Sequence, residues 1–377
     1  MEKGNIKSVL LIDNSVQESG AYHSIRCFIK KLQPRISYYY AVPQGCWNKN
    51  KDIPPSRLEH YQFNELSKSW RLMWYFPQLI TNSIKIGEWV RREGIQIVHV
   101  NDLYNMIGIC VKIMVPKVKL VYHIRLRRTS YARPVFGLWI WLINKFSDVI
   151  VPVSETVEKD MSIPSEKVVR IYDAVEDSRI RSNRKKSFDG NHISFLYIGN
   201  YIPGKGQDHA LRAFEVALRS CKNISLQLVG VTGGNAKNEA YLRSLKQFII
   251  DHELNDSIHI YDQGSDVCDL MMSCDVVLNF SESESFSLVC LEALANGKPV
   301  IATKCGGPQE IIRHLENGIL VENKDVLAMS QAIIKLAVEP TLITKLSNET
   351  QVDFEKKFNA NLLANKLLEV YNQDLAY

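Results

Sequence analysis

The feature that most constrains the fold of this chain is an alternation, repeated in both halves, between short apolar runs and longer segments with helical periodicity. In the first half the apolar runs of strand length are Ser8–Asp13, Ile95–Val100, Lys119–Ile124 and Asp148–Val153. In the second half they are Ile193–Ile198, Ile224–Val229, Ile258–Tyr261, Asp275–Phe280, Pro299–Ala302 and Gly318–Val321. This alternation predicts parallel β-α-β units, so we expect an α/β chain with two doubly wound sheets.

The break between the halves is a polar, basic stretch, Arg179 to His192, that contains the turn dipeptide Asp189-Gly190. Two domains also agree with the length of 377 residues, at about 100–200 residues per domain. The segment that ends the chain carries leucines at helical spacing. The expected organisation is a first domain over 1–178, a linker over 179–192, a second domain over 193–355 and a terminal helix within 356–377.

The composition excludes several classes of protein. Hydrophobic residues make up 46% of the chain and charged residues 23%, as in ordinary globular proteins and unlike disordered or collagen-like chains. The eight cysteines are scattered without a C-x-x-C pair, and the chain opens with no secretory apolar segment. We therefore expect reduced thiols and a cytoplasmic protein. The uncharged apolar stretch Pro134–Asn144 has 11 residues, too few for a bilayer span of about 20.

The charge is unevenly distributed, although the net charge is only +5. Residues 1–180 hold 26 Lys and Arg against 17 Asp and Glu, and the remainder holds 20 against 24. No carboxylate lies between Asp102 and Asp148, where eight basic residues fall. Such a field favours an anionic partner, either a phosphate ligand, an acidic membrane surface or nucleic acid, unless it is simply a solvated basic face. We do not expect nucleic acid, because no basic-aromatic module of a known kind is present.

The segment Ala132–Phe146 is rich in aromatic residues and has cations on both flanks. This combination suits the headgroup boundary of a membrane, but it also suits a helix that covers the sheet of the first domain. We expect the apolar face to cover the sheet and the basic flank to contact an anionic membrane surface, peripherally.

Ligands of doubly wound sheets bind at the carboxyl ends of the strands, so the residues that follow the strands are the candidates for function. In the first half, Gly20 precedes a helix and could let the backbone approach a phosphate, although a simple turn explains it equally well. It does not belong to a G-x-G-x-x-G fingerprint. His99 and His123 end two strands, and His123 lies beside Arg125 in the basic stretch.

In the second half, the strand 193–198 runs into a glycine-rich loop, Gly199–Gly206, that carries Lys205 and precedes a helix. Glycines permit close approach, the lysine supplies a point charge and the helix dipole adds about half a positive charge. These are the features of a diphosphate site, although the Walker A spacing is absent and a turn with a solvated lysine remains the alternative.

The most informative cluster is the segment from Ser281 to Ala302. We expect Ser285 to cap a helix that begins near Phe286, which places Glu284 just before the helix. Glu292 then lies two turns inside, among apolar residues where a surface carboxylate would be unusual. The N–H groups of residues 286–288 would be open at the helix start, and carboxylates accept hydrogen bonds from paired sugar hydroxyls.

These motifs resemble those of the retaining family 4 glycosyltransferases. The E-x7-E pair Glu284 and Glu292 with the following Glu-Ala-Leu-Ala-Asn-Gly-Lys-Pro-Val-Ile-Ala is the most specific match, and Gly306-Gly307-x-x-Glu310 follows it. The loop Gly199–Gly206 is similar to the family's G-R-x-x-x-E-K-G loop. Weaker matches are the Gly20 turn, the strand that ends at Gly230 and the strand Asp148–Ser154.

What the resemblance implies is the GT-B fold: two Rossmann-like domains facing a central cleft, with a C-terminal helix that crosses back to the first domain. It implies a hexosyltransferase-type enzyme that moves a sugar from a nucleotide donor with retention of configuration and with no metal or other cofactor. The implied catalytic residues are His123, Lys205 and Glu284. The implied donor-binding residues are Gly20, Asn200, Lys205, Gly230, Glu284, Phe286, Ser287, Leu288 and Glu292. In these roles Glu292 holds the ribose, Glu284 and the 286–288 amides the donor sugar, Lys205 the diphosphate, and His123 lies beside the sugar.

The chain departs from the family pattern at several positions. The usual arginine and glutamate of the loop are Asn200 and Gly204, which removes one cation from the diphosphate site. The usual double glycine is Gly20-Ala21, and the usual N-G-V-D reads Asp173-Ala174-Val175-Glu176. Arg125 and Arg127 are candidates to replace the lost cation.

The expected partners are a UDP-, GDP- or ADP-linked sugar and a glycan or lipid-linked acceptor, as in polysaccharide or glycoconjugate biosynthesis. A non-catalytic nucleotide-sugar-binding partner subunit is the alternative, and Asn200 and Gly204 motivate it.

Overall fold

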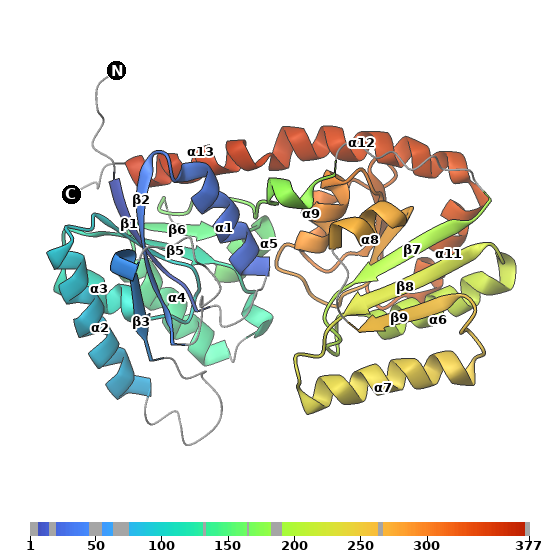
Figure 1. Ribbon diagram of the computed structural model, residues 1–377, viewed down its shortest axis with the longest axis horizontal. Coiled ribbons are helices and arrows are strands. Elements are labelled where there is room, and N and C mark those ends of the chain that lie inside the picture. The colour runs from blue at the N-terminus through green and yellow to red at the C-terminus, as the bar shows by residue number, and fades with distance from the viewer. Residues whose placement is uncertain are drawn as a thin grey trace. The chain divides into compact units, whose positions relative to one another are not determined.

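The computed structural model describes residues 7–14, 20–44, 55–62, 75–130, 133–163, 166–181, 191–262 and 267–373. The chain divides into two compact units (Figure 1). Unit 1 comprises Met1–Ala174 with Ala360–Tyr377, and unit 2 comprises Val175–Asn359. The divisions lie close to the expected limits at 178 and 355, and most of the expected linker, 182–190, falls outside the described residues.

Unit 1 is built on a six-stranded parallel sheet with the order β3-β2-β1-β4-β5-β6. Its strands are β1 (Lys7–Ile12), β2 (Ile36–Pro43), β3 (Leu58–Tyr61), β4 (Ile97–Val100), β5 (Lys119–Ile124) and β6 (Val149–Pro152). The register places Val9 of β1 between Tyr38 of β2 and Ile97 of β4. Strands β2 and β3 lie on one side of β1, and β4, β5 and β6 lie on its other side. The strand order therefore reverses between β1 and β4, and sheets of this kind bind ligands at the carboxyl ends of the strands at such a switch point.

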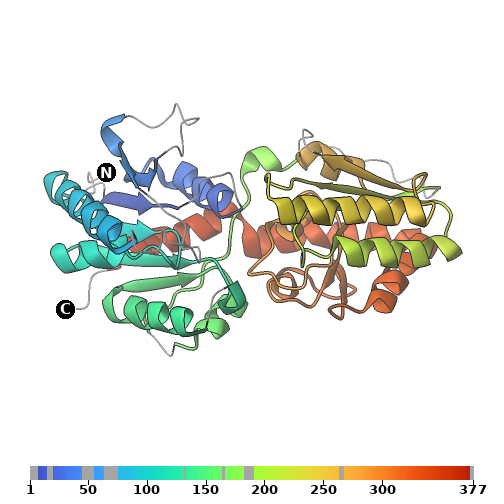
Figure 2. The same ribbon diagram turned by 90° about the horizontal axis from the view of Figure 1, so that it is seen from below.

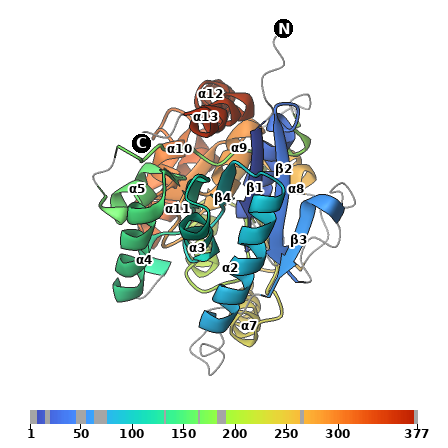
Figure 3. The ribbon, with the colours of Figure 1, turned by 90° about the vertical axis from the view of Figure 1, so that its left-hand side faces the viewer.

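The helices of unit 1 are α1 (Gly20–Leu32), α2 (Tyr75–Arg92), α3 (Ile107–Met114), α4 (Arg133–Phe146), α5 (Glu155–Met161) and α13 (Ala360–Asn372). The chain returns to unit 1 at α13, which packs against α1 with Leu363 and Leu367 in the core. Figure 3 shows α2, α3 and α4 as neighbours in one layer, and they contact one another in that order. In α4, Phe136, Ile140 and Ile143 are buried, as expected of the face that covers the sheet.

Unit 2 repeats the strand order of unit 1, as β9-β8-β7-β10-β11-β12, again all parallel. Its strands are β7 (Ile193–Ile198), β8 (Ile224–Gly230), β9 (Ile258–Asp262), β10 (Val276–Asn279), β11 (Val300–Thr303) and β12 (Gly318–Val321). Its helices are α6 (Gln207–Ser220), α7 (Ala236–Asp251), α8 (Val267–Ser273), α9 (Leu288–Ala295), α10 (Pro308–Ile311), α11 (Val326–Val338) and α12 (Pro340–Phe358). Figure 2 shows α6 and α7, in yellow-green and yellow, alongside each other. The switch point of this sheet lies between β7 and β10.

The expected strands are all present, and β2 and β3 were not expected. Among the described residues, no single helix is long and apolar enough to cross a bilayer; by length and composition alone, the sharply bent pair Val326–Val338 and Pro340–Asn372 would pass.

Candidate functional site

The loop after β7 is built for close backbone packing. Gly206 caps α6 with a φ of 81°, and a Cβ there would lie 2.0 Å from the carbonyl oxygen of Phe280 at the end of β10. Gly230 ends β8, where a Cβ would lie 2.0 Å from the carbonyl oxygen of Gly199. The side chain of Gln207 holds the loop by donating to the carbonyls of Gly199 and Asn200, at 3.1 and 3.0 Å. Only glycine fits Gly206 and Gly230, so these glycines bring the loop onto the ends of β8 and β10.

The loop after β10 is held against the turn that follows β11. The Glu284 N–H donates to Cys305 O at 3.1 Å, and the Gly307 N–H donates to Glu284 O at 3.1 Å. A Cβ on Gly307 would lie 2.1 Å from the Cα of Phe286, and Phe286 itself is buried. This two-sided anchorage fixes the backbone of Glu284 at the carboxyl edge of the sheet.

The expected start of the following helix is wrong. The cap of α9 is Ser287 and not Ser285, and the helix begins at Leu288 and not near Phe286. Ser287 has a φ of 86°, and its Oγ accepts hydrogen bonds from Asn279 Nδ2 at 2.9 Å and from the Cys290 N–H at 3.5 Å. The anchored loop uses two further residues before the chain can turn into the helix. Of the three expected amides, only that of Leu288 lies in the helix.

Glu284 and Lys205, which come from different loops, form an ion pair. Lys205 Nζ donates to Glu284 Oε1 at 2.8 Å, and Ser281 Oγ donates to the same oxygen at 2.8 Å. Burial opposes the charged ammonium, but the Glu284 carboxylate outweighs it and raises the pKa of Lys205. Lys205 is therefore positioned by a carboxylate and is not a mobile, solvated charge.

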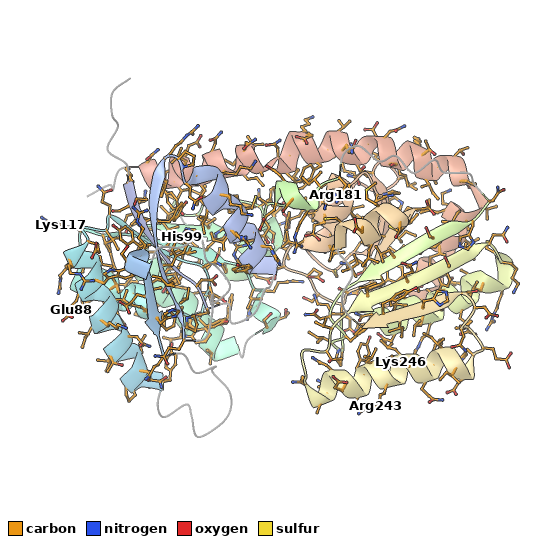
Figure 4. All side chains as sticks on the ribbon, viewed as in Figure 1. Glu88, His99, Lys117, Arg181, Arg243 and Lys246 are labelled. Atoms are coloured by element: carbon orange, nitrogen blue, oxygen red, sulfur yellow. The ribbon has the colours of Figure 1, made fainter. Side chains whose placement is uncertain are left out.

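Glu292 is buried in α9, as expected, and it is paired with a cation that the sequence reasoning did not identify. Its side chain is 6% exposed, and Arg179 Nη1 donates to Oε1 at 2.5 Å. Asn296, one turn further along α9, fixes the segment that carries Arg179: its Nδ2 donates to Arg179 O at 3.0 Å and its Oδ1 accepts from the Arg181 N–H at 2.8 Å. Figure 4 labels Arg181 at this segment.

The sequence contains only an indirect indication that a cation such as Arg179 pairs with Glu292. A carboxylate among apolar residues needs a cation, but 113 positions separate the two residues. We call Lys205, Glu284, Arg179 and Glu292 the paired-charge cluster. Its two cations and two carboxylates balance in charge. Lys205 and Glu284 lie shortly before the first turns of α6 and α9, whose N-terminal ends add a partial positive charge.

Comparison with known proteins identifies the class to which these residues belong. The family model of glycosyl transferases group 1 matches residues 178–353. A D-inositol 3-phosphate glycosyltransferase of Saccharomonospora viridis is 24% identical over 60% of this chain and 57% of its own length. An N-acetyl-alpha-D-glucosaminyl L-malate synthase of Bacillus anthracis is 22% identical over 91% of each chain. The segment 178–353 matches the group 1 family, and the chain is a glycosyltransferase.

Solved structures agree on the fold of this transferase. A glycosyltransferase from Rickettsia africae has a TM-score of 0.81 at 19% identity and covers 98% of each chain. Anabaena HepE, solved in complex with UDP and glucose, has a TM-score of 0.79 at 18% identity and covers 97% of this chain and 99% of its own. The GT-B fold and the enzyme class that the sequence predicted are confirmed.

The remaining expected site residues of the transferase lie in unit 1. Gly20 is the first residue of α1, and residues 15–19 before it fall outside the described part. His123 is fully buried in β5 and stacks on His99 with ring centroids 5.4 Å apart; Figure 4 labels His99 in the interior of unit 1. Burial, Arg125 and His99 hold the pKa of His123 well below its ordinary value, so the ring is neutral at pH 7. Its Nε2 has no hydrogen-bond partner within the described residues.

The two arginines proposed as substitute cations are both engaged within unit 1. Arg125 forms a buried ion pair with Asp173 and donates to Asn101 Oδ1 at 2.7 Å. Arg127 Nε lies 3.0 Å from Asp160 Oδ2. In unit 2, Asn200 is exposed, and its neutral amide supplies no charge. Arg179 is the second cation of the paired-charge cluster. No group of three or more His, Cys, Asp or Glu side chains is arranged for a metal ion in the described ranges.

Proposed function

We propose that the transferase uses a nucleoside diphosphate sugar, which unit 2 binds at the paired-charge cluster. The supporting observation is the pairing of Lys205 with Glu284 at the switch point between β7 and β10. A carboxylate beside an ammonium can take sugar hydroxyls on one side and leave the cation for the diphosphate on the other. Glu292 takes the ribose hydroxyls, and the hydrogen bond from Arg179 holds that carboxylate in place. Because the related HepE structures contain UDP and UDP-glucose, UDP-sugars are the first donors to test.

The proposed reaction retains the configuration of the transferred sugar and needs no metal. The bond between the anomeric carbon and the diphosphate breaks while the acceptor oxygen bonds to the same face. The proton of the acceptor hydroxyl passes to a diphosphate oxygen, so no side chain is required as a covalent nucleophile. Lys205 and the helix amides stabilise the leaving diphosphate. His123, with a neutral ring and an unpartnered Nε2, is the proposed sugar contact of unit 1.

A panel of UDP-, GDP- and ADP-sugars labelled in the sugar tests this function directly. Incubation of the full chain with each donor, with and without a mixture of glycan and lipid-linked acceptors, should give transfer or slow donor hydrolysis with one nucleotide class. The anomeric configuration of the product, read by NMR coupling constants, tests retention, and excess chelator tests metal independence. The absence of both transfer and hydrolysis with every donor would contradict the proposal. Donor binding without turnover would indicate a non-catalytic partner subunit.

We further propose peripheral contact with the inner face of a membrane through α4. The apolar side chains Val135, Leu138 and Trp141 are exposed on this helix, on the side away from its buried residues. Lys145 Nζ lies 5.2 Å from the centroid of the Trp141 ring, so a cation and an indole share this surface. This pairing suits a headgroup layer, where each basic residue near anionic lipid contributes about 1 kcal/mol.

Sedimentation with liposomes tests the membrane contact. We expect binding to anionic vesicles that falls at high salt and falls again in a Leu138→Ser/Trp141→Ser variant. Equal partition into neutral and anionic vesicles would rule out the charge-driven part.

A further inference from the structure

The guanidinium of Arg125 is the centre of a buried hydrogen-bond network at the carboxyl ends of β4 and β5 in unit 1. Arg125 is 6% exposed. Its Nε donates to Asn101 Oδ1 at 2.7 Å, its Nη1 donates to the carboxylate of Asp173, and its Nη2 lies 3.5 Å from His123 Nδ1. A guanidinium carries only donors, so each of these three partners presents an acceptor to it. The network therefore determines which atoms of Asn101 and His123 remain for other contacts.

Asp173 holds the guanidinium in place and lies in a segment that is itself anchored on both sides. The Ile171 N–H donates to a carbonyl of β6 at 3.2 Å, and the Ala174 N–H donates to Ser24 Oγ of α1 at 3.1 Å. Asp173 is 7% exposed, so its ion pair with Arg125 lies in the interior. A buried ion pair of this kind adds little net stability, because desolvation offsets the attraction. Its effect here is geometric, since it holds the donors of Arg125 at their acceptors.

The contact with Arg125 assigns the proton of the neutral His123 ring. A proton on Nδ1 would point a donor at another donor beside a positive charge, whereas a bare Nδ1 accepts from the guanidinium. The proton of the neutral ring therefore lies on Nε2. The ring is fully buried and stacks on His99, with a centroid distance of 5.4 Å and an interplanar angle of 18°, which holds its orientation.

The two side chains that turn their acceptors to Arg125 keep donors that have no partner. Neither His123 Nε2 nor Asn101 Nδ2 has a hydrogen-bond partner within the described residues. Asn101 is 1% exposed and His123 is fully buried. Buried polar atoms are almost always paired. Two orphan donors at the ends of the paired strands β4 and β5, both oriented by one guanidinium, therefore indicate a ligand that brings acceptor oxygens.

A fixed proton on Nε2 limits what His123 can do. With the lone pair of Nδ1 facing Arg125, the ring has no free lone pair for a proton, so it cannot serve as a general base. Burial, Arg125 and His99 also hold the pKa of His123 well below its ordinary value, which disfavours an imidazolium acid. The remaining role is the donation of one hydrogen bond to an oxygen. This role agrees with a reaction in which the acceptor proton passes to the diphosphate.

We propose that Arg125, aligned by Asp173, is a positioning residue that fixes the proton of His123 on Nε2, so that His123 acts only as a hydrogen-bond donor to the transferred sugar. The inference rests on the proposed function for the sugar that receives this hydrogen bond. The tautomer itself is a property of the free chain, so it can be measured without any ligand.

The test of the tautomer uses the full chain labelled with nitrogen-15 histidine. Long-range proton–nitrogen NMR correlations distinguish the two neutral tautomers, and His123→Gln identifies the signal of His123 among the nine histidines. We expect the proton on Nε2. In Arg125→Met/Asp173→Asn, which removes both charges and leaves no buried unpaired ion, we expect a mixture of tautomers. Lys112→Met/Asp148→Asn removes another ion pair of unit 1, with atoms 2.8 Å apart, and is the matched control that should keep the tautomer.

Kinetics with the accepted donor test the role of the Nε2 proton. The amide nitrogen of Gln replaces the donor at Nε2 but cannot act as a base, so His123→Gln should retain transfer to within about tenfold, whereas His123→Ala should lose about 100-fold. Arg125→Met/Asp173→Asn should lower kcat about tenfold without changing the Kd of the nucleotide, which unit 2 holds. In the His123→Gln background the same double substitution should lower kcat by less than about threefold, because an amide has no tautomer to fix.

The inference and the proposed function fail in different ways. If no nucleotide sugar binds or reacts, the proposed function fails, and the tautomer of the free chain still tests the positioning by Arg125. A proton on Nδ1 of His123, or an unchanged tautomer in Arg125→Met/Asp173→Asn, would overturn the inference alone. Equal losses of transfer in His123→Gln and His123→Ala would also overturn it. If Arg125→Met/Asp173→Asn does not fold, the tautomer of the unaltered chain and the comparison of the two His123 variants decide the inference.

Discussion

The two units share one strand order, yet the carboxyl edges of their sheets carry opposite kinds of chemistry. In unit 2 the edge carries the paired-charge cluster, with Lys205 on Glu284 and Arg179 on Glu292. In unit 1 the corresponding edge carries tyrosines and amides, and its buried cation, Arg125, is neutralised by Asp173. The same backbone frame thus carries two different sets of side chains, since the frame determines only where the strands end and the sequence at those ends determines the chemistry.

The difference also appears in how the charges are held. Each carboxylate of the paired-charge cluster accepts a hydrogen bond from a cation, and in the proposed function the donor shares or displaces that cation. The buried histidines of unit 1 have no such partner: burial lowers the pKa of His99 to about 3, and its Nδ1 lies 2.6 Å from the Tyr371 hydroxyl of α13. Burial thus keeps the two stacked histidines of unit 1 neutral, while the carboxyl edge of unit 2 carries ion pairs.

The substitution of Lys205 should have the largest effect and tests whether the charged edge of unit 2 acts on the donor. Lys205→Ala should reduce kcat by about 10²–10³-fold, or about 2.7–4 kcal/mol, because one preorganised donor to the leaving diphosphate is removed. Steady-state kinetics with the accepted donor provide the measurement. Lys335→Ala, which removes an exposed lysine paired with Glu339 on α11, is the control and should change little. A near-normal kcat in Lys205→Ala would place the diphosphate elsewhere.

Substitution of Glu284 should reduce the rate of sugar transfer without reducing the affinity for nucleotide. Glu284→Gln keeps the shape of the side chain but removes the charge that accepts from Lys205 and Ser281. We expect transfer to fall by about 10–150-fold, the value of one charge-assisted hydrogen bond of about 1.5–3 kcal/mol. UDP affinity, measured by calorimetry, should be retained or increase because Lys205 is released from its carboxylate. Equal losses in both measurements would refute the assignment of Glu284 to the sugar.

The pair of Arg179 and Glu292 should act on donor binding rather than on turnover. Glu292→Ala should raise the donor Kd by up to about 150-fold with a smaller change in kcat, since the ribose contact is made equally in ground and transition states. In a double-mutant cycle with Arg179→Ala, the coupling should be about 0.5–3 kcal/mol. Additive effects on Kd would show that Arg179 does not position Glu292.

A smaller, pH-dependent effect should come from unit 1. Burial raises the pKa of Asp102, after β4, to about 7, with a further contribution from Asp13 that the Leu103 N–H and Arg125 only partly oppose. Between the ordinary pKa near 4 and this value, the folded carboxyl holds a proton that the unfolded chain has lost. Stability therefore falls as pH rises through this window. Asp102→Asn should reduce the drop in Tm between pH 5 and pH 8, and an unchanged drop would contradict the raised pKa.

The sequence predicted the fold better than the details of the site, for physical reasons. Buried parallel strands are continuous apolar runs, so ten of them could be located from the sequence. The two missed strands have a different composition: β2 has three consecutive tyrosines among its eight residues, and β3 is a four-residue edge strand, Leu58–Tyr61, with two polar residues. Glu284, Glu292 and Lys205 were identified because they lie next to strands or within an apolar helix.

The missed features depend on contacts that local patterns do not encode. Ser287 replaces Ser285 as the cap of α9 because the loop before it is anchored through Glu284 to the turn after β11. Arg179 meets Glu292 across 113 positions of sequence.

The most direct test of the central claim, that unit 2 holds a nucleoside diphosphate through Lys205, is a calorimetric titration of UDP, GDP and ADP into the full chain. The account predicts that one of these nucleotides binds with one-to-one stoichiometry and that Lys205→Ala weakens it at least tenfold, while Lys335→Ala binds as the unaltered chain does. Binding of none of the three, or equal affinity in the unaltered chain and Lys205→Ala, would contradict it.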